Sequence, residues 1–208
     1  MRTHHAVAVP LTALIAALLV VDTVVLAVTG ERTVVTDDEK GGLAATLGMA
    51  VLLGVTVLAC CVVVAREKER FDVAGRVARA TRRPLLLGLG MLAAGSGVVH
   101  PLELALDVED GPVAVVSGLL AGLSLLLVFV PLLVLGLATL RHNPFGVGAR
   151  VLAALGPVVV LTVLLGVVAP DVASPVLLTG LALVGTSLIG VRTTEAAATQ
   201  PAAGSVPV

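Results

Sequence analysis

The sequence predicts an all-α integral membrane protein, a bundle of six transmembrane helices. Of the 208 residues, 58% are hydrophobic and only 13% are charged, whereas soluble domains usually carry about 25% charged residues. The mean hydropathy is +1.11. Because a helix needs about 20 apolar residues to cross the hydrocarbon core, six long stretches with few or no charged residues can each supply one span.

The expected spans follow these stretches along the chain. They cover residues 6–29, 42–65, 84–106, 113–140, 149–169 and 173–191. Residues 1–192 are therefore expected to form a single transmembrane domain. Within it, residues 66–83 are a basic cytoplasmic linker. The tail, residues 193–208, is rich in Ala, Thr, Pro and Gly and is expected to be disordered.

Two of the spans need justification. The first continues past Asp22 and exceeds the roughly 7–15 apolar residues of a signal-peptide core, so it is expected to be an uncleaved helix. The fourth stretch, residues 111–140, is too short for two spans, which need about 40 residues. It is expected to be one tilted helix, kinked at Pro131.

The distribution of charge predicts the orientation of the bundle. Placing the N-terminus inside leaves eleven basic residues inside and two outside, in accord with the positive-inside rule. The inside residues are Arg2, Arg66, Lys68, Arg70, Arg76, Arg79, Arg82, Arg83, Arg141, Arg150 and Arg192. Eight acidic residues fall outside. Both termini are therefore expected to be cytoplasmic.

Weak internal similarity suggests a helical hairpin repeated three times. Similar tripeptides, each containing Gly-Leu, open the even-numbered spans at residues 41–43, 117–119 and 179–181. The segment 71–77 also resembles 145–151 at Phe, Val, Arg and Val. An apolar sequence of few residue types produces such matches by chance, so the repeat concerns architecture and carries no activity.

A small polar cluster is the candidate intramembrane site. Asp22 and His100 are each expected about 24 Å up their spans, because each lies about 16 residues from the start of its helix. Ser96, His100 and Glu103 share one helix face, and Pro101 is expected to kink the helix beside them. Since ionisable groups are costly inside a bilayer, these residues define either an outward-facing polar vestibule or ordinary polar helix ends.

The sequence gives little reason to expect a metal or a cofactor. His100, Glu103 and Asp22 offer three ligands, but no second His is expected near them. His4 and His5 are expected on the opposite side of the membrane. No nucleophile and base, and no nucleotide loop, is recognisable, so enzymatic activity is not expected.

The linker is expected to touch lipid headgroups. Residues 66–83 carry seven Lys or Arg and three acidic residues. From Phe71 onward a weakly apolar stripe suggests a short surface helix, with Arg76, Arg79, Arg82 and Arg83 facing anionic headgroups, each contributing about 1 kcal/mol. A loop that only sets the topology would have the same residues.

These observations favour an accessory or structural bundle that binds a partner membrane protein, a second copy of itself or lipid. The alternative is a small proton- or cation-linked transporter or channel that uses the polar vestibule. With a net charge of −1 and no Tyr or Trp, no nucleic-acid partner is expected. The scarcity of Lys suggests GC-rich coding, and hence a bacterial plasma membrane as the location.

Overall fold

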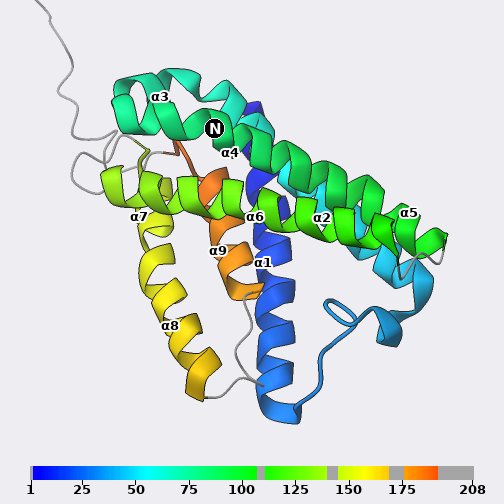
Figure 1. Ribbon diagram of the computed structural model, residues 1–208. Helices are drawn as coiled ribbons and strands as arrows, with labels where there is room; N and C mark the ends of the chain where they lie inside the picture. Colours follow the sequence, from blue (N-terminus) through cyan, green and yellow to red (C-terminus); the bar gives the residue numbers. More distant parts are fainter. Residues whose placement is uncertain (1, 107–110, 140–144, 169–175, 192–208) are drawn as a thin grey trace, which may run out of the picture.

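The chain folds into a bundle of helices (Figure 1). The computed structural model describes residues 2–106, 111–139, 145–168 and 176–191, and within these ranges it contains helices and no strand. The predicted disordered tail, residues 193–208, lies outside the described residues. The helices are α1 (Thr3–Thr29), α2 (Asp38–Arg66), α3 (Lys68–Val73), α4 (Arg76–Ala94), the π-helical turn η1 (Gly95–Val99), α5 (His100–Ala105), α6 (Pro112–Thr139), α7 (Val147–Ala153), α8 (Leu155–Val168) and α9 (Val176–Ser187).

Among the described residues, five helices are long and apolar enough to cross a membrane. They are Thr3–Thr29, Lys40–Arg66, Arg76–Ala105, Pro112–Thr139 and Val147–Leu164. The α9 helix is also apolar, but its 12 residues extend only about 18 Å against a core of about 30 Å. The all-helical, membrane-embedded class is therefore confirmed, and the sixth span stays a prediction.

The outer surface of the bundle is apolar, as lipid requires. On α6, Leu119, Leu126 and Leu137 are exposed at 69%, 62% and 55%, while Val128 and Leu135 are buried. A helix on the surface of a soluble protein would carry polar residues on its outer face. Since α6 is apolar on both faces, its exposed leucines match a hydrocarbon environment better than water. The predicted single helix is observed, with Pro131 inside it.

The helices form two sets that cross (Figure 1). In this view the axes of α1, α8 and α9 are upright, whereas α2, α4 and α6 lie across them. Within the sets, α1 packs on α9, and α4 packs on both α2 and α6. Contacts of α1 and α9 with α2 join the two sets. The short helix α7 also joins them, because it contacts both α6 and α9.

Glycines permit the closest helix contacts. A Cβ added to Gly54 of α2 would lie 2.5 Å from the Cα of Gly97 in η1. One added to Gly136 of α6 would lie 2.6 Å from the carbonyl carbon of Leu152 in α7. Small residues let helix backbones approach in this way, and van der Waals packing then replaces the hydrophobic drive that lipid cannot supply.

The linker differs from the single surface helix expected for it. It forms α3 and the first part of α4, separated at Gly75, whose φ of 106° suits a residue without a side chain. Phe71 is fully buried and packs on Phe145 with ring centroids 4.9 Å apart, and Ala78 is buried as well. The apolar stripe therefore faces the protein core, because α3 folds back onto the bundle.

Replacing Gly136 with Ala should destabilise the bundle by about 1–3 kcal/mol, the usual cost of overpacking, because the new methyl group meets the Leu152 backbone. Thermal unfolding in detergent measures the change. Gly122→Ala, in the same helix but with no atom within 4 Å of its Cβ position, is the matched control. It should be neutral or slightly stabilising, and equal effects of the two variants would refute the close crossing.

Candidate functional site

A groove between the α4–η1–α5 segment and α6 contains three residues of the predicted polar cluster. Its volume is about 470 Å³. Most of its wall is apolar, and its polar lining residues are Ser96, His100, Glu103, Ser117 and Ser124. Val99 and Leu120, which also line it, are 41% and 50% exposed. The groove therefore opens on the lipid-facing surface of the bundle.

The π-helical turn shapes this wall of the groove. The backbone N–H of His100 donates to the carbonyl of Gly95, five residues earlier. Pro101 has no N–H to donate, so the α-helical pattern is interrupted where the sequence predicted a kink. Ser96 lies within the turn, His100 follows it, and Glu103 lies one turn further on.

Most polar groups of the groove are satisfied by their own helix. The hydroxyls of Ser96, Ser117 and Ser124 donate to the carbonyls of residues 92, 114 and 121 at 2.7, 3.1 and 2.7 Å. Glu103 is different: its Oε1 is buried and accepts no hydrogen bond from the described residues. A buried acceptor without a donor is costly, so this oxygen marks where a ligand could bind.

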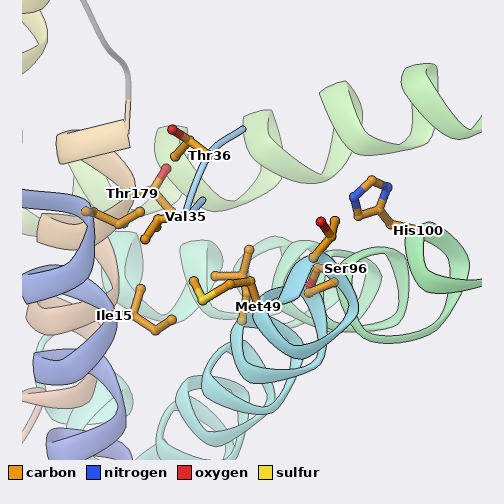
Figure 2. A pocket seen from close by; sticks show the side chains of 11 residues that line it. Ile15, Val35, Thr36, Met49, Ser96, His100 and Thr179 are labelled. Carbon is orange, nitrogen blue, oxygen red and sulfur yellow. The ribbon is translucent and has the colours of Figure 1, made fainter. Parts of the chain in front are cut away.

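Ser96 and His100 also line a second cavity, of about 250 Å³, between α1, α2 and α9 (Figure 2). His100 lies at one end of this cavity, and Thr36 and Thr179 lie at the other, with Met49 between them. The two cavities share only Ser96 and His100 among their lining residues. His100 therefore lies at the wall between them.

Asp22, the fourth member of the predicted cluster, is held by the loop after α1. It is 2% exposed and accepts hydrogen bonds from the backbone N–H and hydroxyl of Thr33 at 2.8 and 2.6 Å, and from the Thr36 hydroxyl at 2.6 Å. Because these donors fold the loop back over α1, Asp22 has a structural role. Asp22 does not line the second cavity, but Thr36, whose hydroxyl donates to it, does.

A second charged cluster lies where the N-terminus meets the joint between α2 and α3. Glu67 is 1% exposed. Its Oε1 lies 3.1 Å from Nη1 of Arg2, 3.0 Å from Nε2 of His4 and 3.4 Å from Nε2 of His5. Its Oε2 accepts a 2.6 Å hydrogen bond from Nε of Arg70. This cluster joins residues 2–5 to residues 67–70, two segments that are far apart in sequence.

The surroundings of Glu67 keep its carboxylate charged. Burial raises the pKa of Glu67, but the hydrogen bonds from His4 and Arg70, together with the charges of Arg70 and Arg2, outweigh it and leave the pKa below its ordinary value. Sequence reasoning counted Glu67 only as a linker charge. The available signal was topological, since the same orientation places His4, His5 and Glu67 all on the cytoplasmic side.

The arginines expected at lipid headgroups occupy two kinds of position. Arg76, Arg79 and Arg83 are exposed, and Arg79 also pairs with Asp72 at 3.0 Å. Arg82 instead donates to the carbonyls of Val64 and Ala65 at 3.2 and 2.9 Å. These carbonyls end α2, so Arg82 satisfies helix-terminal acceptors. Headgroup contact by the four arginines stays a prediction.

Comparison with known proteins gives no family. No family model, no curated protein and no solved structure matches the chain.

Replacing Asp22 with Ala should lower the free energy of unfolding by about 1–3 kcal/mol, since three donors of the 31–37 loop lose their acceptor. Thermal unfolding in detergent measures it. Glu31→Gln removes an exposed carboxylate that pairs with Lys40 at 2.7 Å. Surface substitutions of this kind usually stay within about 0.5 kcal/mol. If Asp22→Ala were as mild as this control, the structural role of Asp22 would be wrong.

Proposed function

We propose that the chain is an accessory or structural membrane protein whose α4–α6 groove binds a lipid with a protonated amine in its headgroup. The proposal includes six spans in the plasma membrane of a bacterium, with both termini cytoplasmic. The charge asymmetry supports this topology, and the apolar α9 would supply part of the sixth span. The three-hairpin repeat is part of the same proposal; Phe71 and Phe145, equivalent in that repeat, pack on one another.

The observation that carries the proposal is the buried Oε1 of Glu103, which accepts no hydrogen bond from the part of the chain that the structure describes. It lies in a groove whose volume, about 470 Å³, falls within the roughly 300–1,000 Å³ of small-molecule sites. An acyl chain fits a wall containing Met91, Leu92 and Leu120. An ammonium group would supply the hydrogen-bond donor and the positive charge that the Glu103 carboxylate does not find beside it in the described residues. A lipid carries both parts in one molecule, and it reaches the groove directly from the bilayer.

Glu103→Gln should lower the retained fraction of phosphatidylethanolamine about tenfold, because a hydrogen bond to a charged group contributes about 1.5–3 kcal/mol. Native mass spectrometry of the chain, released from nanodiscs of phosphatidylethanolamine and phosphatidylglycerol, measures the bound lipid. Glu31→Gln, at an exposed carboxylate, is the control and should retain the lipid.

Filling the groove provides an independent arm of this experiment. Ala121→Phe projects a large side chain from a lining position and should displace the lipid. Leu119→Phe, at a position that is 69% exposed and does not line the groove, should not. Retention of phosphatidylethanolamine by both Glu103→Gln and Ala121→Phe would refute the site.

The placement of His100 favours one alternative function, proton- or cation-linked transport. His100 and Ser96 line both cavities, so an imidazole, a side chain able to carry a proton between them, lies at the wall that the two cavities share. Asp22 adds no free carboxylate here, since Thr33 and Thr36 donate to it.

If the chain transports protons or cations, His100→Ala should abolish a pH-driven flux into proteoliposomes, because the wall between the cavities loses its titratable group. A pH-sensitive dye inside the vesicles reports the flux. Thr179→Ala, which alters the far end of the second cavity, is the control and should preserve it. Absence of flux through the unaltered chain under any imposed gradient would exclude transport.

A further inference from the structure

We propose that His4, His5 and Glu67 form a zinc site at the expected cytoplasmic end of the bundle. The site is separate from the α4–α6 groove and does not depend on the lipid proposed there. It would join the first turn of α1 to the joint between α2 and α3.

The three ligand atoms have the spacing that one small cation needs. Each residue offers one atom, and the three atoms lie within 4.8 Å of one another. The Glu67 Oε1 lies 3.0 Å from Nε2 of His4 and 3.4 Å from Nε2 of His5. Tetrahedral zinc, with bonds of about 2.0–2.1 Å, separates its ligands by about 3.3 Å. Small side-chain movements therefore suffice to bring all three onto one ion.

The hydrogen bond of His5 on its other nitrogen gives independent support. Nδ1 of this buried ring lies 3.0 Å from the carbonyl oxygen of Ser187. A carbonyl only accepts, so Nδ1 carries the proton. When the ring is neutral, Nε2 turns a lone pair toward the Glu67 carboxylate, and a cation bound between the two atoms would be stabilised by both. Metal-binding histidines are commonly oriented by such a bond from the other nitrogen to a carbonyl.

The arginines around Glu67 have different roles in this site. Arg70 holds the far oxygen, Oε2, at 2.6 Å, and so orients the carboxylate while leaving Oε1 to face the histidines. Arg2 contacts Oε1 itself at 3.1 Å, through a side chain that is 61% exposed. Because Arg2 is an exposed cation on the oxygen that zinc would use, zinc displaces Arg2 and not Arg70.

The packing around the carboxylate holds it in place. A Cβ added at Gly190, just beyond α9, would lie 2.9 Å from Oε2 of Glu67 and 2.8 Å from Nε of Arg70. The chain after α9 thus closes over the pair. Two imidazoles and one carboxylate, with a fourth position left for water, are the donors that zinc takes in many proteins.

Isothermal titration of the purified full chain with zinc alone, in detergent and without a histidine tag, tests the site. We expect one zinc per chain, bound at least about tenfold more weakly by His4→Ala and by His5→Ala. Arg2→Ala should bind zinc as tightly or more tightly, since the competing cation is gone. His100→Ala, at a histidine outside this cluster, should leave the affinity unchanged.

Cobalt in place of zinc gives a readout that needs no variant. The unaltered chain should show the visible absorption bands of tetrahedral cobalt, and His4→Ala, which changes a side chain at the edge of the cluster, should lose them. Absence of saturable zinc binding would overturn the proposal, as would a zinc affinity unchanged by His4→Ala or lowered by Arg2→Ala.

Discussion

Close backbone contact at glycines is the constraint on which the arrangement of the helices depends. In lipid, burying a leucine between helices gains little, because the acyl chains are equally apolar. Stability must then come from short-range dispersion, which requires near contact. Gly54 against Gly97 joins α2 to η1, Gly136 against Leu152 joins α6 to α7, and Gly148 against Leu188 joins α7 to the chain just after α9. These crossings fix where grooves remain between the helices.

The polar groups show the complementary constraint. A buried carboxylate in this environment is costly unless donors surround it. Asp22 receives donors from a short loop, and Glu67 is surrounded by the N-terminal residues Arg2 and His4 and by Arg70. Glu103 alone among these three carboxylates has a buried oxygen without a donor in the described chain. Asp22 and Glu67 are therefore held by the protein itself, whereas Glu103 can still accept a hydrogen bond from a ligand.

Local sequence patterns predicted where the helices lie along the chain. Which polar residues come together in a site depends on contacts between distant segments, which these patterns do not predict. The expected spans 6–29, 42–65 and 113–140 lie close to α1, α2 and α6, because chain length and freedom from charge are local properties. The third helix begins earlier than expected, at Arg76, since Arg82 is accommodated at the end of α2. Proximity of His4 to Glu67 depends on how the N-terminus packs, and no spacing along the chain encodes it.

The π-helical turn determines the direction in which the side chains of α5 point. Such a turn holds one residue more than an α-helical turn, so everything after it is rotated by about 100° relative to a continuous helix. The residues Gly95–Val99 therefore rotate α5 about the helix axis relative to α4. Without that extra residue, His100 and Glu103 would turn away from α6, and the Glu103 oxygen that lacks a donor among the described residues would leave the groove although no polar residue had changed.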